Sequence, residues 1–292
     1  MRLLGYLVLV KSVGVTSMLS INTNIGALRA ADAAYSVNKS MDTSMHRLSS
    51  GKRINSAADD AAGVQISQRM NAEIAGLKQS SRNAADAQAL FATADGALEE
   101  IHNLLQRLRE IAVQSANDTN NTADRTALQT EVTALEADID RIRNDTTWAG
   151  ILLLNGTSSG SNEFTFQVGP DSGDTIAHTI PDMLHTATTL SLNGNVSSRT
   201  DANAYITLVD TAIDNLGTER EQLGALMNRL DYTMSNLTNM STNLSLAKGR
   251  IEDADFAAES SNLARTQVLQ QASMSMLAQA NAAKQNILAL FQ

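Results

Sequence analysis

Histidines and paired carboxylates are the side chains in this sequence whose chemistry could support a reaction or hold a metal ion. The four histidines, His46, His102, His178 and His185, are scattered along the chain. They include no His-Glu-x-x-His pair, the spacing that lets two histidines on one helix face bind zinc. The chain also has no cysteine, which excludes disulfides, thiolate metal sites and cysteine nucleophiles. We therefore interpret the histidines as ordinary surface or hydrogen-bonded residues.

Paired carboxylates occur at Asp59-Asp60, at Glu99-Glu100, and at Asp138 with Asp140. Two carboxyl groups in one pocket could in principle divide the roles of acid and base. On an amphipathic helix such pairs more often form a solvated face, and no aromatic cluster surrounds them to line a pocket. The sequence therefore predicts no catalytic residue, no cofactor and no metal, and we expect a protein that is not an enzyme.

The composition favours long helices. Hydrophobic residues make up 43% of the chain but aromatic residues only 3%, so Ala, Leu, Ile, Val and Met carry the apolar content. Both prolines, Pro170 and Pro181, lie in the middle, which leaves two arms free of the strongest helix breaker. The net charge of -9 and the lack of a Lys/Arg cluster argue against nucleic acid as a partner.

The N-terminal arm shows helical periodicity in three stretches. Apolar residues recur every three or four positions from Met18 to Leu48, and a polar, Gly-containing break follows at residues 49–56. A second stretch carries the same spacing from Ile66 to Leu108 and ends near residues 117–121. A third, from Leu128 to Ile142, forms a heptad face.

The C-terminal arm holds the longest periodic stripe, which we call the seam. Its members are spaced by seven: Val209, Leu216, Leu223, Leu230, Leu237, Leu244 and Ile251. Apolar residues such as Ala212, Leu226 and Met240 occupy intervening positions, so the seam predicts a helix packed against a partner helix. The last stretch, from Phe256 to Phe291, continues helically with an apolar face of small and flexible residues.

The centre, roughly residues 146–200, is rich in Gly, Ser, Thr and Asn. Phe164, Phe166 and Val168 alternate with polar residues, which is typical of a strand, and residues 169–173 supply a turn before Ile176. The whole pattern predicts a mainly α fold. We expect a long antiparallel helical bundle or coiled coil, formed by the two arms, with a small central β-hairpin region.

The first 17 residues differ from the rest. The apolar run from Leu3 to Val10 resembles the core of a secretory signal and is too short to span a bilayer. Two interpretations stand: a signal, or an upstream start codon wrongly assigned ahead of Met18. We favour the second, because residues 15–17 form a poor cleavage site, and we expect residues 1–17 to be absent from the mature protein.

Long stretches at both ends resemble bacterial flagellin. At the N-terminal end these are Ser20-Ile21-Asn22-Thr23-Asn24 and the run from Leu48 to Gly63, LSSGKRINSAADDAAG. At the C-terminal end they are RIEDADFAAE, from Arg250 to Glu259, and QNILALFQ, from Gln285 to Gln292. The resemblance covers nearly the whole chain from Met18.

The resemblance implies a structural subunit that polymerises into the bacterial flagellar filament for swimming motility. It implies an inner terminal domain (residues 18–50 and 255–292), a helical outer core (51–145 and 201–254) and a solvent-facing central region (146–200). Because that centre is short, we expect a flagellin with little or no extra outer domain.

The resemblance also implies partners, a location and assembly residues. The expected partners are other copies of the chain, the flagellar export apparatus with an export chaperone, and the hook-filament junction and cap proteins. No membrane partner is expected, and the protein should be secreted to the extracellular filament. Residues expected to drive polymerisation are Ile21, Ile25, Leu28, Met276, Ile287, Leu290 and Phe291.

One helical segment has two compatible interpretations. Residues Gln106, Arg107, Leu108, Arg109, Glu110 and Ile111 fit an ordinary helix with alternating charges, whose core face is formed by Leu105, Leu108 and Ala112. The same segment resembles the part of flagellin that Toll-like receptors recognise, with Arg107 and Glu131 at the matching charged positions and Ile111 in place of the family's usual leucine. We expect this face to contact neighbouring subunits and keep receptor recognition as an open alternative.

Two alternatives to a filament subunit remain at this stage. A hook-filament junction adaptor has similar terminal helices, and a chemoreceptor-like coiled coil would need a transmembrane span that the sequence lacks. The close match at both ends favours the filament subunit. We further expect the two terminal segments to be disordered in the monomer and to fold on assembly.

Overall fold

The computed structural model describes residues 23–156 and 163–289, with backbone alone for residues 284–289. This part of the chain forms two compact units. We call the described residues up to Gln65 together with those from Arg250 the terminal unit, and Ile66–Gly249 the central unit. The boundaries expected from sequence lay near residues 50 and 255. The terminal unit also contains residues 51–65 and 250–254, which lie beyond those boundaries.

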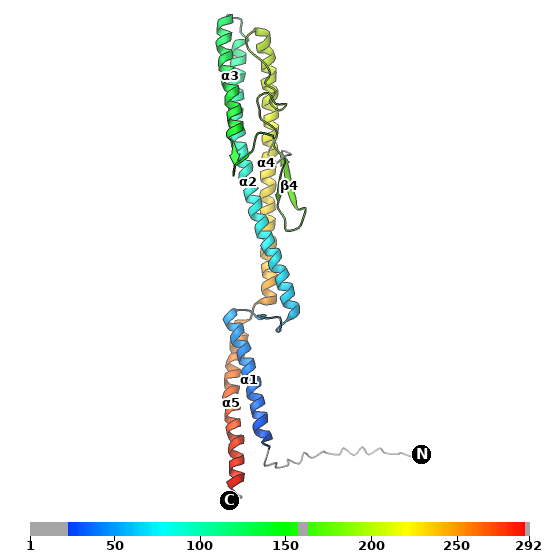
Figure 1. Cartoon of the computed structure of the whole chain (residues 1–292), viewed down its shortest axis with the longest axis vertical. Coiled ribbons are helices and arrows are strands. Elements are labelled where there is room, and N and C mark those ends of the chain that lie inside the picture. The colour runs from blue at the N-terminus through cyan, green and yellow to red at the C-terminus, as the bar shows by residue number, and fades with distance from the viewer. Residues whose placement is uncertain (1–22, 157–162, 290–292) are drawn as a thin grey trace, which may run out of the picture. The chain divides into compact units, whose positions relative to one another are not determined.

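The terminal unit is built on two antiparallel helices that lie side by side, α1 (Ile25–Ser50) and α5 (Phe256–Ala289) (Figure 1). Asn24 caps α1 by accepting a hydrogen bond from the Ala27 amide. The helix ends at Gly51, whose φ of 70° is left-handed and suits glycine. The predicted break after Leu48 is thus confirmed, whereas the expected start at Met18 falls outside the described residues.

Two connecting segments of the terminal unit are held together by a short backbone ladder. The Arg53 amide donates to the Glu252 carbonyl at 2.7 Å, and the Ala254 amide donates to the Gly51 carbonyl at 3.0 Å. Lys52 forms an ion pair with Glu252, which is only 7% exposed. These contacts hold residues 51–53 against residues 252–254 within the terminal unit.

The central unit contains most of α2 (Ala61–Ser115) and α4 (Arg199–Glu252) together with α3 (Thr122–Asp145). Pairs that link α2 to α4 fix an antiparallel direction: Gln88 with Asp231, Asp95 with Arg220, and Arg109 with Asp210. On α3, Asn121 and Asp124 form a reciprocal capping box. The three predicted helices and the antiparallel arrangement of the arms are therefore confirmed.

The seam is buried over only part of its length. Val209, Leu216, Leu223 and Leu230 are fully buried and Leu237 is 5% exposed. Farther along α4, Leu244 and Ile251 are half-buried, and Leu246 is 60% exposed. The sequence predicted that the seam is buried as far as Ile251. In the single chain this prediction is wrong beyond Leu237. The central strands reach α4 at Glu219, where His178 of β4 forms a hydrogen bond with it. Farther along α4 the strands no longer cover the helix (Figure 1). A helix with a single partner buries only a narrow face.

The centre forms two small antiparallel hairpins. Strands β1 (Thr147–Trp148) and β2 (Ile151–Leu152) make one, and β3 (Glu163–Gln167) and β4 (Thr175–Thr179) make the other. In the second, Phe166 pairs with Ile176, as the predicted strand and turn require. Trp148 of β1 packs against the core cluster just after the end of α3.

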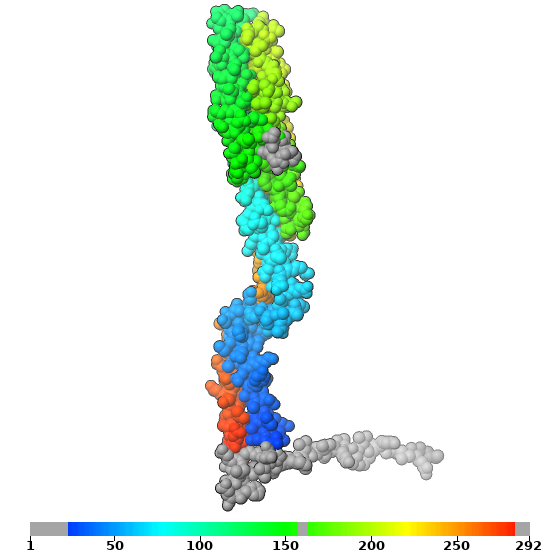
Figure 2. Space-filling view, in the orientation of Figure 1, coloured from blue at the N-terminus to red at the C-terminus, as the bar shows by residue number. Residues whose placement is uncertain are grey.

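The hairpins cover the helices with one face instead of standing free of them. Phe91 of α2 meets the ring of Phe166 edge-on at a centroid distance of 5.4 Å, and Ile180 and Met183 are buried. In Figure 2 the green surface of β3 and β4 lies directly against the neighbouring helices and does not form a lobe of its own. The inner face of the predicted solvent-facing region is therefore core, and only its outer face meets solvent.

Candidate assembly interface

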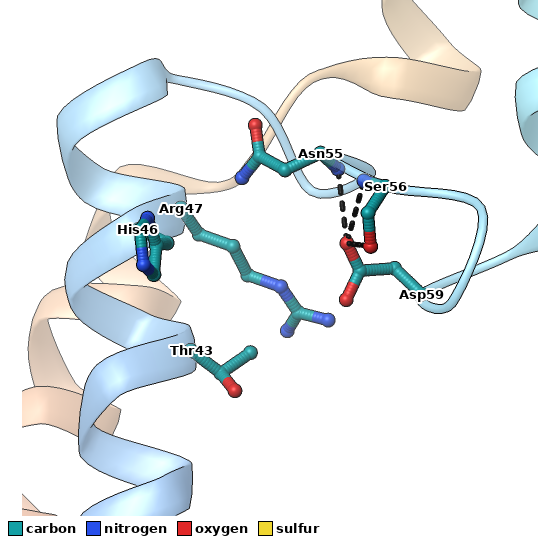
Figure 3. Close-up of a pocket in the computed structure, with 6 residues that line it drawn as sticks. All are labelled: Thr43, His46, Arg47, Asn55, Ser56 and Asp59. Atoms are coloured by element: carbon teal, nitrogen blue, oxygen red, sulfur yellow. Dashed lines mark hydrogen bonds between the residues drawn. The ribbon is translucent and has the colours of Figure 1, made fainter.

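A hollow at the end of α1 is the place in the terminal unit where polar side chains converge (Figure 3). Its volume is about 240 Å³, and it is lined by Thr43, His46, Arg47, Asn55, Ser56 and Asp59. Asp59 accepts hydrogen bonds from the Ser56 amide at 2.9 Å and from the Asn55 amide at 3.1 Å. These backbone donors, Ser56 first, hold the pKa of Asp59 below its usual range. The carboxylate therefore braces the connecting loop, and we assign the hollow no reaction.

Beside this hollow, an ion pair between Arg47 of α1 and Glu259 of α5 joins the two terminal helices. The Arg47 Nη1 atom lies 3.0 Å from Glu259 Oε1, and the Glu259 side chain is 9% exposed. Hydrogen bonds from Asn262 and Arg47 lower the pKa of Glu259 from its ordinary value of 4.5. A lowered pKa in the folded state stabilises that state above pH 4.5. The contribution is lost as the pH falls through the lowered pKa.

Glu259→Gln should make filaments less stable at neutral pH and weaken their response to acid. Glutamine keeps the shape of the side chain but removes the charge that faces Arg47. The measurement is the sedimenting fraction of preformed filaments between pH 7 and pH 3, with the exposed Glu73→Gln as a control expected to match wild type. Equal pH midpoints for Glu259→Gln and wild type would contradict the assignment.

The predicted chemistry-bearing residues have structural roles where their contacts are described. His178 Nε2 lies 2.9 Å from Glu219 Oε1, and His185 Nδ1 lies 2.8 Å from Asp140 Oδ2. These pairs tie the central segment to α4 and α3. Glu99 forms an ion pair with Arg220 at 3.4 Å. Within the described residues, no group of three or more His, Asp or Glu side chains could hold a metal ion.

Sequence reasoning missed Glu219, which lies at an intervening position of the seam and is 6% exposed. A charged residue at an apolar heptad position was the available signal. Its buried carboxylate needs a partner, and His178 of β4 supplies it. The His178 ring also meets Phe91 edge-on at a centroid distance of 5.9 Å.

The segment 106–111 exposes one side of the helix to solvent and buries the other. Gln106, Arg107, Arg109 and Glu110 are exposed, and Arg107 joins Glu131 at 2.7 Å and Glu110 at 2.9 Å. These hydrogen bonds, Glu131 first, raise the pKa of Arg107 above its usual value.

Leu108 and Ile111, by contrast, are fully buried. The burial of Leu108 confirms the core face predicted for it, whereas the surface contact expected of Ile111 does not fit its burial. Their three-residue spacing places them on the core face of α2.

Apolar side chains of the terminal unit are largely exposed. On α1, Ile25 is 52% and Leu28 57% exposed, and on α5, Val268 is 65% and Met276 65% exposed. Leu269, one position after Val268, is 45% exposed, so apolar residues occupy more of the α5 circumference than α1 covers. Exposed apolar side chains gathered in this way normally mark a surface that a partner covers.

Both C-terminal helices contain a long stretch without charge. No ionisable acid, base or histidine occurs at residues 266–283 of α5 or at residues 233–247 of α4. Exposed apolar side chains lie in both stretches, including Met274 at 57% and Leu246 at 60%. Interface cores are depleted of charge in the same way.

Comparisons with known proteins identify the chain. Two family models, described as bacterial flagellin N-terminal and C-terminal helical regions, match residues 21–159 and 206–291. A flagellin of Halalkalibacterium halodurans is 41% identical over 277 residues, covering 93% of this chain and 99% of that protein. The chain belongs to the bacterial flagellin family. A flagellin of Bacillus subtilis is 37% identical over 302 residues, with the same coverage of both chains.

A solved structure described as a putative flagellar hook-associated protein from Vibrio parahaemolyticus has a TM-score of 0.57. It covers 67% of this flagellin and 100% of that chain at 16% sequence identity, and therefore shows a shared fold alone. The flagellin relatives instead match at 41% and 37% identity over nearly the full length. This flagellin is a structural subunit of the bacterial flagellar filament, as the terminal sequence motifs predicted.

The flagellin residues expected to drive polymerisation are described only in part. Ile25, Leu28 and Met276 are exposed in the single chain, as an assembly role requires. Ile21, Leu290 and Phe291 lie outside the described residues, as does the whole extension 1–17. Ile287 lies in α5, but its side chain is outside the described part. Among the described helices, none has the length and hydropathy of a membrane span.

Proposed function

We propose that this flagellin polymerises through the outer faces of α1 and α5 and through the uncharged stretch of α4. The observation that carries the proposal is the exposure of large apolar side chains there, with Val268 and Met276 each 65% exposed. Water-exposed apolar patches of this kind mark binding surfaces. Head-to-tail contacts between identical subunits that do not close into a ring generate a helical filament.

The terminal unit has too little core to be stable by itself. Among its described hydrophobic residues, only Ala34 at 8% and Ile54 at 5% exposure count as buried. Fully burying a large apolar side chain gains roughly 1.5 to 3 kcal/mol. Ordering the backbone costs ~1 to 2 kcal/mol per residue. We therefore propose that α1 and α5 are disordered in the monomer and fold when neighbouring subunits cover them.

The central unit has a large hydrophobic core and the terminal unit has almost none. This difference supports dividing the subunit into an inner and an outer part of the filament. The hydrophobic cluster of the central unit runs from Ala84 to Leu230 and includes residues from all three helices and the hairpins. Such a core can fold alone, so we propose it as the outer part of the subunit. The terminal unit becomes the inner part, surrounded by copies of itself, and the outer face of the hairpins remains in solvent.

A photo-crosslinking amino acid at position 269 tests the self-interface directly. In filaments it should link one chain to another at high yield, and in monomers it should give no chain-to-chain product. The same amino acid at exposed Thr175 of β4 is the matched control, because the proposal leaves that strand face in solvent. Absence of chain-to-chain links from position 269 in filaments would overturn the proposed interface.

The remaining partners follow from membership of the family and from the filament's place outside the cell. We propose that the flagellar export apparatus, with an export chaperone, secretes the chain and that it assembles between the hook-filament junction and the cap. A subunit that folds its ends only on assembly suits export as an unfolded chain. We propose no catalytic activity, because the paired carboxylates with described contacts form ion pairs or brace loops.

Recognition by a Toll-like receptor is a second function that the exposed part of segment 106–111 favours. A groove of about 690 Å³ is lined by Gln106, Arg109, Glu110, Val113, Gln114, Asp210 and Ile213. It combines charges of both signs with Val113, which is 49% exposed. Aliphatic contact ringed by charge is a usual form of a protein-binding surface.

Arg107→Ala should reduce receptor activation by soluble flagellin at least tenfold while changing stability little. Arg107 and Glu131 are 48% and 42% exposed, and surface pairs of this kind contribute about 0 to 1 kcal/mol. The measurements are a receptor reporter assay and a thermal melt of the monomer. Arg82→Ala, a substitution on the exposed face of α2 outside segment 106–111, serves as the control. Undiminished activation by Arg107→Ala would contradict receptor recognition at this face.

A further inference from the structure

Several methionines are exposed on the surfaces assigned to assembly. Among the described methionines, four are exposed: Met45 at 53%, Met240 at 39%, Met274 at 57% and Met276 at 65%. Met183, in the central core, is fully buried. Methionine is usually an interior residue, so four exposed thioethers require an explanation.

The exposed thioethers coincide with the proposed assembly faces. Met45 lies on α1, and Met274 and Met276 lie in the uncharged stretch of α5. Met240 lies in the uncharged stretch of α4. None of the four belongs to the central hydrophobic cluster. Their oxidation would therefore leave the central core intact.

We propose that Met45, Met240, Met274 and Met276 are sites of oxidation by peroxides, and that their oxidation blocks addition of the subunit to the filament. The inference rests on the proposed assembly faces and adds a chemical control of them. Once a subunit has assembled, its neighbours cover the same sulfur atoms and protect them. Oxidants therefore act on the incoming subunit and spare the existing filament.

The chemical step is a two-electron oxidation of sulfur. A sulfur lone pair attacks one peroxide oxygen, the O–O bond breaks and an S–O bond forms. Hydrogen peroxide is reduced to one molecule of water, and the thioether becomes a sulfoxide. The rate depends on access of the oxidant to the sulfur, so an exposed methionine reacts sooner than Met183.

The sulfoxide turns an apolar contact into a polar one. Its oxygen is a strong hydrogen-bond acceptor, and a close-packed apolar interface offers it no donor. Each subunit repeats the change at every contact it makes, so the penalty acts on every addition step. The flexible thioether otherwise suits a repeated interface, since methionine adapts its shape to its neighbours.

Seeded growth after mild peroxide treatment tests the inference. Monomer is exposed to hydrogen peroxide until mass spectrometry finds sulfoxide at the four exposed methionines and none at Met183. Its growth on untreated seeds should fall at least tenfold. Growth should return after treatment with methionine sulfoxide reductases, a repair that damage elsewhere in the chain would not show. In intact filaments the same four sites should oxidise at least tenfold more slowly than in monomer.

A quadruple variant, M45L/M240L/M274L/M276L, separates the sites from other effects of peroxide. Leucine conserves volume and cannot form a sulfoxide, so peroxide treatment should leave the growth of this variant close to that of the same variant untreated. M183L, the control, should remain as sensitive as wild type. Normal growth of oxidised wild-type monomer, or equal inhibition of the quadruple variant, would overturn the inference. Failure of the proposed interface is distinguishable, because it appears as absence of crosslinks from position 269 in untreated filaments.

Discussion

Leu230→Ala should lower the free energy of unfolding of the central unit by roughly 2 to 5 kcal/mol. Leu230 is fully buried at the end of the hydrophobic cluster and belongs to the seam that packs α4 against its neighbours. Removing its side chain takes apolar surface out of the core and leaves a cavity that the helices close only in part. Urea denaturation of the monomer, followed by circular dichroism, measures the loss.

Leu246→Ala is the matched control for Leu230→Ala. The same chemical change is made on the same helix, but Leu246 is 60% exposed. Surface substitutions of this kind change stability by about 0.5 kcal/mol or less. An equal loss of stability in both variants, or no loss in Leu230→Ala, would show that the buried half of the seam is not the core.

Leu269→Asp should reduce seeded filament growth at least a hundredfold and leave the monomer as stable as wild type. Leu269 is 45% exposed in a stretch of α5 that contains no charged residue. We expect a neighbouring subunit to bury it. A carboxylate removed from water without a partner is strongly unfavourable, and the penalty recurs at each added subunit. Sedimentation or light scattering follows growth, and a thermal melt follows the central unit.

Thr175→Asp is the control for Leu269→Asp. It introduces the same charge at an exposed strand residue that is proposed to face solvent in the filament. Its growth should match wild type. If Leu269→Asp grows as fast as Thr175→Asp, the outer face of α5 is not an assembly surface.

Much of the fold could be predicted because the sequence signals are local and long. The seven-residue spacing from Val209 to Leu237 specifies one buried face, and the structure confirms that face. The alternation of Phe164 and Phe166, with turn residues after it, likewise specified the β3–β4 hairpin. Gly51 marked the end of α1 because it adopts a left-handed conformation there.

What could not be predicted depends on contacts between segments distant in sequence. Periodicity shows which face of α4 is apolar but not where its partners end, so the exposure of Leu246 and the half-burial of Leu244 were missed. The pairing of Glu219 with His178 joins α4 to β4 and leaves no local pattern in either. Burial of the inner face of residues 146–200 likewise depends on contacts between the hairpins and α2, which are distant in sequence.

The assembly surface was predictable as a region rather than as a set of side chains. The Ala- and Met-rich face from Phe256 onward indicated an adaptable interface, and α5 exposes Met274 and Met276 there. Within segment 106–111, the resemblance to the family grouped exposed and buried residues together. Helical geometry separates them, because Leu108 and Ile111 face the core while Arg107 and Glu110 face solvent.

Amide hydrogen exchange on the monomer and on the filament most directly tests the claim that the terminal unit folds as the subunit assembles. Exchange is compared for backbone amides of α1 and α5, with the amides around Leu216 in α4 as an internal reference. We predict that α1 and α5 exchange within seconds in the monomer and become protected at least a hundredfold in the filament. The α4 reference should be protected in both. Strong protection of α1 and α5 in the monomer, or rapid exchange of both helices in the filament, would contradict coupled folding and assembly.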